Sequence, residues 1–350
     1  MVIVLIMSGR NKSFLLLLAF AGSGASAIAQ KGEPDPSYIR EFPGTITVRT
    51  FLGEKISGFN LIDGQHAERL RYRPNNVLGL GFGTTIRGFG INISTRLPFH
   101  NDKEERYGKT TQLDLQVHRY RGKFALDIYF QRYSGFHLAD SSDVTAVVGN
   151  TDYPYFPDMK SITAGASGLY VFNGRRFSLR APIDQQDWQV RSAGSWLLGG
   201  SVFAHVITNN EQSFIPPYLK RADFMSGHRV SKIQNYSATV NGGYGYNYII
   251  REHYFLGLSA DVGVGLGYSE IKDEGGTSHK LGLQLNGNAR VAFGYNSRKW
   301  FSGFYIIFRE DRFDLPFDQS FATSNEGIAR LTVARRIITR KKHLGGLSNQ

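Results

Sequence analysis

The sequence predicts an all-β protein: a transmembrane, up-and-down, antiparallel β-barrel of about 12 strands, with short periplasmic turns and long outer loops. Three observations lead to this prediction. Two long segments have a period of two, further segments of the same kind follow one another along the chain, and the connections between them alternate between short and long.

The clearest period-two pattern runs from Tyr254 to Tyr295. Every second residue from Tyr254 to Tyr268 is apolar, the residues between them are small or polar, and the pattern resumes at Leu281 after a polar break. Because a strand rises about 3.3 Å per residue, each run reaches roughly 50 Å, which is enough to cross a bilayer and project past it. Tyrosines bracket the apolar face, where an interfacial girdle would lie.

The composition agrees with this class of protein. The 350 residues include 40 Gly, 18 Tyr and 25 Phe, with only 41% hydrophobic residues. A barrel has such a composition because only alternate residues of its strands face lipid. There is no Cys, which excludes disulfides, thiolate metal sites and a cysteine nucleophile. The net charge of +12 favours anionic partners: membrane lipids, including lipopolysaccharide, rather than nucleic acid in an exported chain.

The N-terminus is predicted to be a signal peptide, residues 1–29. Arg10 and Lys12 precede an apolar run that is too short to span a bilayer, and small residues follow, so that cleavage is expected after Ala27 or Ala29. Residues 30–43 are predicted to be a periplasmic linker, residues 44–336 the barrel, and residues 337–350 a basic C-terminal tail.

The predicted strands share the period-two pattern and end at turn residues. They are Thr45–Leu52, Val77–Ile86, Phe89–Leu97, Thr111–Tyr120, Lys123–Tyr133, Ser161–Phe172, Ala193–Val206, Tyr236–Ile250, Tyr254–Tyr268, Leu281–Tyr295, Phe301–Arg309 and Gly327–Arg336.

The connections provide an independent test. Tight turns at residues 87–88, 121–122, 251–252 and 296–299 alternate with long connections, as expected for periplasmic turns and outer loops. The long ones are Gly53–Asn76, Pro98–Thr110, Ser134–Lys160, Ile207–Asn235, Ser269–Lys280 and Glu310–Glu326. Arg175–Ala181 breaks the rule, being either the start of an interrupted strand or part of a larger periplasmic turn. The interrupted strand is favoured because it keeps the number of strands even, as expected when both termini lie on the periplasmic side.

Four segments carry a resemblance to a known family. They are YIREFPGTITVRTFLGEK from Tyr38, YRPNNVLGLGFG from Tyr72, YGKTTQLDLQVHRYRGKFALDIYFQRYSGF from Tyr107 and SITAGASGLYVFNGRRF from Ser161. The chain resembles the domain of unknown function 4421 family, exported proteins of Bacteroidetes-type bacteria, from about Tyr38 to its end. The resemblance implies an outer-membrane-like β-barrel and supplies no catalytic residue.

Polar residues on strand faces are the candidate site. If the polar face is the lumen, these side chains either line a pore or cross-link a sealed barrel through charge-assisted hydrogen bonds. The pore-lining candidates are Asp114, His118, Asp127, Asp261, Gln284, Asn286 and Arg290.

The other chemical signals are weak. The alternating glycines Gly79–Gly83 and Gly263–Gly267 lie within strands and do not form a phosphate-binding loop, so no cofactor or metal is predicted. Histidines next to Ser on a strand, such as His279, cannot pair with it directly because adjacent side chains point to opposite faces. An enzyme is therefore not expected.

The sequence thus predicts a protein of a Gram-negative outer membrane, most simply a non-enzymatic channel or envelope protein whose polar lumen passes or binds a small solute. The alternatives are a lipid-modifying enzyme, or a scaffold that binds an envelope partner through its outer loops. Outward or inward orientation of Leu256, Leu258, Val262 and Val264 decides whether the barrel is a membrane protein.

Overall fold

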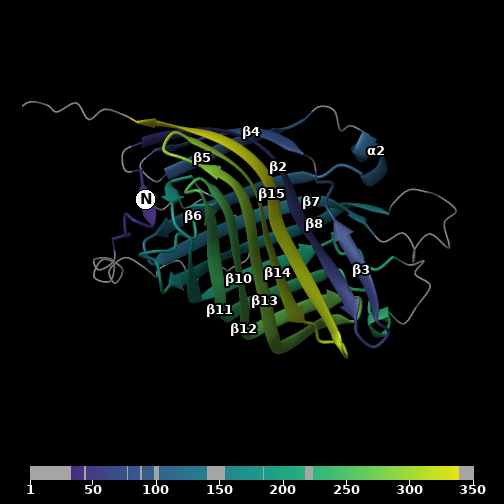
Figure 1. Ribbon diagram of the computed structural model, residues 1–350. Coiled ribbons are helices and arrows are strands. Elements are labelled where there is room, and N and C mark those ends of the chain that lie inside the picture. Colours follow the sequence, from purple (N-terminus) through teal and green to yellow (C-terminus); the bar gives the residue numbers. More distant parts are fainter. Residues whose placement is uncertain are drawn as a thin grey trace, which may run out of the picture.

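The computed structural model is a long β-barrel whose strands cross it obliquely (Figure 1). The structure describes residues 33–42, 45–76, 78–86, 89–97, 102–139, 154–183, 185–216 and 224–338. The predicted signal peptide and nearly all of the basic tail lie outside these residues. No helix in the described part of the chain is long and apolar enough to cross a membrane.

All twelve predicted strands are present, and most are longer than predicted. They are β2 (Thr45–Asp63), β4 (Gly79–Ile86), β5 (Phe89–Arg96), β6 (Thr111–Arg121), β7 (Phe124–Leu138), β8 (Tyr155–Val171), β10 (Ala193–Thr208), β11 (Lys232–Ile250), β12 (Tyr254–Asp273), β13 (Gly276–Asn296), β14 (Trp300–Asp314) and β15 (Ser320–Ile338). The remaining elements are β1 (Ile39–Glu41), β3 (Glu68–Arg73), β9 (Asp187–Gln189), α2 (Asp102–Tyr107) and η2 (Phe224–Gly227).

The barrel closes through antiparallel pairing of β15 with β2, from Ser320 opposite Asp63 to Ile338 opposite Thr45. At the outer end β3 joins β2 to β7, with Tyr72 opposite Leu138. The described residues thus form a closed ring of ten strands: β2, β3, β7, β8 and β10 to β15. The predicted fold class is confirmed, although β3 lies in a segment predicted to be a loop.

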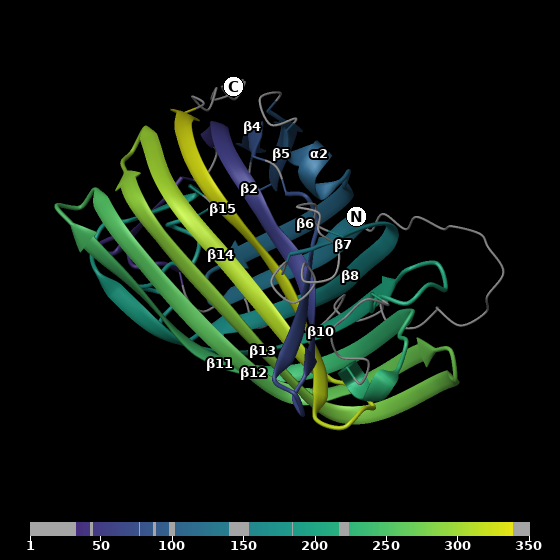
Figure 2. The same ribbon diagram turned by 90° about the vertical axis from the view of Figure 1, so that its right-hand side faces the viewer.

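The other three strands belong to the periplasmic half of the wall. There β4 pairs with β2, β5 pairs with β4, and β6 pairs with β7. Among the described residues, β5 and β6 do not pair with each other. At the outer end β3 stands between β2 and β7 in place of these three strands, and there the ring of paired strands is continuous (Figure 1). Figure 2 shows the same barrel from the side, with β2 and β15 next to each other.

The apolar face of the strands points outward. Leu256, Leu258, Val262 and Val264 are 39%, 46%, 70% and 56% exposed, and similar residues on neighbouring strands form one belt around the barrel. The alternate face holds side chains such as Asp261 and Gln284, which are 2% and 0% exposed. A soluble barrel would have the opposite arrangement, because it buries its apolar face. An exposed belt of this kind is the surface that lipid covers.

Three predicted outer loops are wrong because the strands continue through them. Ser269–Lys280 is a tight hairpin that turns between Asp273 and Gly276, Glu310–Glu326 belongs mostly to β14 and β15, and Gly53–Asn76 contains the end of β2 and all of β3. Beyond the belt, outward side chains meet water, so the alternation that reveals a membrane strand disappears from the sequence.

Residues 173–192 (184 is not described) fold into the periplasmic mouth of the barrel, and we call them the mouth plug. The favoured interpretation of Arg175–Ala181 as an interrupted strand is wrong: these residues form turns within a larger periplasmic connection. In this plug β9 pairs with β1, so part of the predicted linker is a strand. A Cβ on Gly257 of β12 would lie 2.7 Å from Pro182, so this glycine makes room for the plug.

Candidate functional site

The centre of the barrel contains an ion-pair layer built by inward residues of four strands, β6, β7, β12 and β13. Arg290 of β13 lies 3.3 Å from Asp261 of β12 and 3.8 Å from Asp127 of β7. The Tyr120 hydroxyl donates to Asp127 at 2.6 Å. These side chains converge because strand alternation points all of them inward, and the guanidinium compensates two carboxylates removed from water.

Amide and hydroxyl groups extend this layer across the barrel. Asn288 and Asn241 donate to Asp261 at 2.8 and 3.2 Å, and Asn241 also donates to Asn286 at 2.6 Å. Asn286 in turn donates to Thr239 and Ser201 at 2.7 and 3.1 Å. Strands β10 to β13 are thus cross-linked through their inner faces by a continuous chain of polar contacts.

A second buried cluster lies on β8, β10 and β14. Arg309 makes two hydrogen bonds to Asp311, both 2.7 Å, and its guanidinium lies 3.3 Å from the ring centre of Phe203. His205, 1% exposed, has Nδ1 3.2 Å from the Thr163 hydroxyl and Nε2 3.6 Å from Asp311. The order hydroxyl, imidazole, carboxylate resembles a catalytic arrangement, but Asp311 is already held by Arg309 and the group is enclosed.

The structure brings four of the predicted pore-lining residues together: Asp127, Asp261, Asn286 and Arg290 all belong to the central layer. Asp114 lies apart, where it pairs with Lys55 at 2.6 Å and accepts from Gln131 at 3.1 Å. Gln284 is fully buried, and neither of its amide atoms has a hydrogen-bond partner among the described residues. His118 belongs to β6, but its side chain lies outside the described part of the structure.

Sequence reasoning missed several members of the interior. Asp311 lay in a predicted loop, and Asn241 and Tyr120 lay in predicted strands whose polar or aromatic side chains carried no separate signal. Lys55 also lay in a predicted loop. Alternation along the true, longer strands would have placed Asp311 and Lys55 inward, but the true strand ends were not visible in the pattern.

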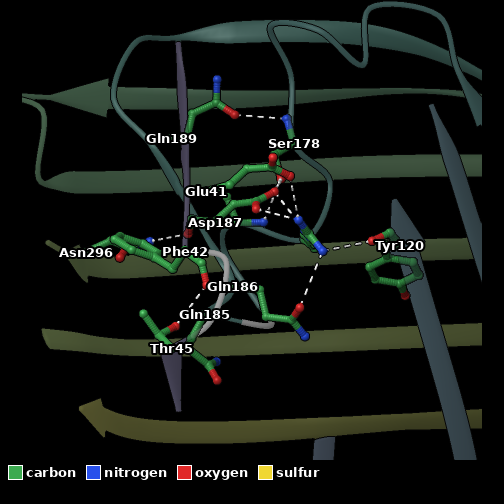
Figure 3. Close-up of polar contacts among 12 residues, drawn as sticks. Glu41, Phe42, Thr45, Tyr120, Ser178, Gln185, Gln186, Asp187, Gln189 and Asn296 are labelled. Atoms are coloured by element: carbon green, nitrogen blue, oxygen red, sulfur yellow. Dashed lines mark hydrogen bonds and ion pairs between the residues drawn. The ribbon is translucent and has the colours of Figure 1, made fainter. Parts of the chain in front are cut away.

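The mouth plug is held by charged and amide contacts (Figure 3). Arg180 donates to both carboxylate oxygens of Asp187 at 2.8 and 2.6 Å, to the backbone oxygen of Tyr120 at 3.0 Å, and to Glu41 at 3.1 Å. The Ser178 hydroxyl also donates to Asp187, at 2.6 Å. The plug is therefore fixed to β6 and to the N-terminal segment as well as to itself.

The barrel wall makes further contacts to the plug. Arg336 of β15 donates to the backbone oxygen of Gln185 at 2.8 and 2.7 Å, and Arg49 of β2 donates to its side chain at 3.0 Å. Asn296, the last residue of β13, donates to the backbone oxygen of Asp187 at 3.0 Å. Phe177 and Leu179 pack on inner-face residues of β8 and β10, so the plug is anchored by apolar burial as well.

The outer end of the interior is apolar. Buried side chains of the strands and of residues 209–216 and 224–231 form one cluster, which we call the outer cap. It includes Phe59, Tyr72, Phe136, Phe214 and Met225. Two pockets lie against the mouth plug, one lined by Pro182 and the other by Arg180, each with a volume of about 20 Å³. Such a volume holds about one water molecule, so neither pocket is a solute path.

A closed antiparallel barrel with an exposed apolar belt and a polar, filled interior defines an outer-membrane β-barrel protein. The chain belongs to the family described as Domain of unknown function (DUF4421), whose model matches residues 33–334. The predicted membership is thereby confirmed. No curated protein matches the chain.

Solved structures with similar chains are outer-membrane barrels. The outer membrane protease OmpT from Escherichia coli is 11% identical with a TM-score of 0.37, covering 85% of this chain and 98% of its own. OprG from Pseudomonas aeruginosa is 10% identical with a TM-score of 0.22, covering 85% and 98%. The COG4313 outer membrane channel from Pseudomonas putida F1 is 11% identical with a TM-score of 0.24, covering 87% and 100%.

Proposed function

We propose that this protein is a sealed, non-enzymatic envelope protein of a Gram-negative outer membrane, which it reaches through a cleaved signal peptide, residues 1–29. The observation that carries the proposal is the filling of the interior at three successive levels. The mouth plug, the central ion-pair layer and the outer cap each occupy the lumen. A passive channel needs a continuous aqueous path, and three consecutive seals argue against one.

The non-enzymatic part of the proposal is supported by the position of the histidine most suited to catalysis. His205 faces Thr163 and Asp311, but it is 1% exposed and stacks between Phe203 and Phe313. A lipid-modifying enzyme needs a nucleophile that lipid can reach. The rigid, sealed barrel is better suited to present its outer surface to lipids or to an envelope partner.

Conductance measurement tests this function. Purified protein reconstituted in planar bilayers is expected to give no steady single-channel currents, and vesicles containing it are expected to retain trapped small solutes. Folding is verified in the same preparation: a folded barrel should stay folded in detergent until the sample is heated. Steady currents from folded protein would overturn the proposal. Turnover of vesicle lipids that Thr163→Val abolishes would instead favour the lipid-modifying enzyme.

A further inference from the structure

The outer face of β3 carries a stripe of three arginines, Arg69, Arg71 and Arg73. Leu70 and Tyr72 between them are 3% and 0% exposed and belong to the outer cap, so strand alternation directs the three arginines away from the interior. We call Arg69, Arg71 and Arg73 the arginine stripe. A strand with alternate arginines facing outward concentrates positive charge along one line of the barrel surface.

A fourth arginine lies across two strands from the stripe. Arg71 is opposite Asn60 of β2, Asn60 is opposite Thr323 of β15, and Thr323 is opposite Arg312 of β14. Asn60 and Thr323 are joined by a 2.6 Å hydrogen bond. The outer face of β2, β3, β14 and β15 is therefore a polar patch bounded by arginines on two sides.

Positive charge exceeds negative charge in this patch. The outward carboxylates of β14 are Glu310 and Asp314, against four arginines. No carboxylate in the described part of the chain lies within ion-pair distance of Arg69, Arg73 or Arg312. Burial lowers the pKa of Arg73 to about 10, and the positive charges of Arg71 and Arg69 add to the shift, which Glu310 opposes. An anion placed between them would relieve this repulsion.

The patch also contains buried acceptors that lack donors. Asn60 and Asn325 are 6% and 7% exposed, both lie on outward positions of their strands, and their side-chain oxygens have no hydrogen-bond partner among the described residues. Unpaired buried acceptors are costly, and both oxygens lie beneath the surface of the patch. A ligand that supplies N–H or O–H donors would satisfy them only after the side chains that cover them move aside, which a bare anion has no reason to cause.

The height of the patch matches the outer headgroup region. On β2 the last strongly exposed apolar residue is Leu52, and on β14 it is Ile306. The stripe pairs with β2 beyond that point, between Phe59 and Asp63, and Arg312 likewise follows Ile306 toward the outer end. Basic groups just above an apolar belt are placed to meet lipid phosphates.

We propose that the outer face of β2, β3, β14 and β15 binds the headgroup of a phosphorylated glycolipid in the outer leaflet. Arg71 and Arg312 hold phosphate oxygens. Once the side chains that cover them move aside, the side-chain oxygens of Asn60 and Asn325 accept hydrogen bonds from hydroxyl or amide groups of the sugar. The inference rests on the outer-membrane placement in the proposed function. It names the lipid class that this face recognises.

Lipid retention in nanodiscs tests the proposal. The full chain is assembled in phosphatidylcholine containing a trace of a diphosphorylated glucosamine lipid, or of the same lipid without phosphates, and co-purified lipid is quantified by native mass spectrometry. We expect preferential retention of the phosphorylated form, and at least about a tenfold loss with Arg71→Gln plus Arg312→Gln, since each arginine supplies charge-assisted hydrogen bonds. Arg298→Gln plus Arg335→Gln, at the periplasmic end, is the matched control and should retain the lipid.

Two further arms make the outcomes decisive. Asn60→Leu plus Asn325→Leu should reduce the preference for the sugar lipid over phosphatidylglycerol, while inorganic phosphate should compete only weakly. Equal retention of both lipid forms, full retention by the arginine variant, or complete displacement by phosphate alone would overturn the inference. The same protein variants are also reconstituted in vesicles and checked for solute leakage. Leakage with intact lipid selectivity would overturn only the sealed-barrel function, and loss of selectivity with sealed vesicles would overturn only this inference.

Discussion

Arg290 and Asp261 face each other in the centre of the barrel, with Nη1 and Oδ2 3.3 Å apart and both side chains nearly inaccessible to solvent. They lie on neighbouring strands, and the same guanidinium reaches Asp127 on the far side of the interior. Arg290 therefore connects two parts of the wall that are distant along the sequence, and the shorter of its two ion pairs, the one with Asp261, lies where little solvent reaches.

Replacing Arg290 with Met is expected to destabilise the barrel strongly. Asp127 and Asp261 would keep their buried charges without the arginine, and removing one partner of a buried ion pair typically costs about 3–5 kcal/mol. Equilibrium unfolding by guanidinium chloride in lipid vesicles measures the loss.

Arg298→Met is the matched control, because Arg298 lies in an exposed turn, and it should change the free energy of unfolding by less than about 0.5 kcal/mol. Asp127→Asn plus Asp261→Asn in the Arg290→Met background should restore part of the stability. A single variant as stable as the parent would show that the pair is not a structural link.

Gly257→Val is expected to loosen the mouth plug. A Cβ at this position would lie 2.7 Å from Pro182 and 2.9 Å from the Asn247 side chain, too close for either to stay in place. Because the chain has no Cys, Leu179→Cys is a clean reporter, and we expect its thiol to react with maleimide at least about tenfold faster in the Gly257→Val background than in the parent background.

The comparison is Gly242→Val on β11, where an added Cβ meets nothing within 4 Å. This change should leave the labelling rate of the reporter unchanged. Equal acceleration by both glycine variants would mean that the effect comes from strand distortion, and the assigned packing of Pro182 would be incorrect.

Arg180→Ala should release the plug without disturbing the strands. The side chain donates to Asp187, Glu41 and the backbone of Tyr120, and each charge-assisted bond contributes about 1.5–3 kcal/mol. We expect proteases to cleave within the plug of the variant, with the strand core intact on gels. Arg176→Ala, whose side chain is 58% exposed, should remain resistant.

The sequence revealed the membrane strands because lipid on one face and polar side chains on the other enforce a period of two. The belt around Leu256 and Val262 follows directly from this pattern. The same pattern makes four inward residues predictable, because alternation alone decides which face of a strand a side chain belongs to. They are Asp127, Asp261, Asn286 and Arg290. Whether they line a pore or close it depends on distances between distant strands, which alternation does not encode.

The plug and the outer cap were not predictable by these means. Phe177 and Pro182 occupy the lumen through contacts with glycines on β11 and β12, far away in sequence, and the segment itself has no regular period. β3 was missed because Arg69, Arg71 and Arg73 make it resemble a polar loop. Its alternation is the reverse of a membrane strand: apolar residues face the interior and charges face outward.

Asp63, at the outer end of β2 above the apolar belt, should make the outer cap sensitive to acid. Burial opposes its ionisation, but hydrogen bonds from His66 at 2.9 Å, the Met225 N–H at 2.8 Å and the Gln65 N–H at 3.0 Å outweigh this and lower the pKa of the carboxyl group. A carboxyl group with a lowered native pKa stabilises the fold above its ordinary pKa of 3.8, and this contribution is lost as the pH falls through the native pKa.

Asp63→Asn is therefore expected to reduce the stability at neutral pH by about 1–3 kcal/mol, since the bonds to the Met225 N–H and His66 lose their charge assistance. Thermal unfolding of parent and variant across the acid range measures this difference, which should shrink once the pH falls below 3.8 and vanish below the native pKa. Asp318→Asn, on the exposed turn before β15, should match the parent at every pH. A difference between parent and Asp63→Asn that persists in acid would mean that the Asp63 side chain acts by shape, and that its charge does not hold Met225 in the outer cap.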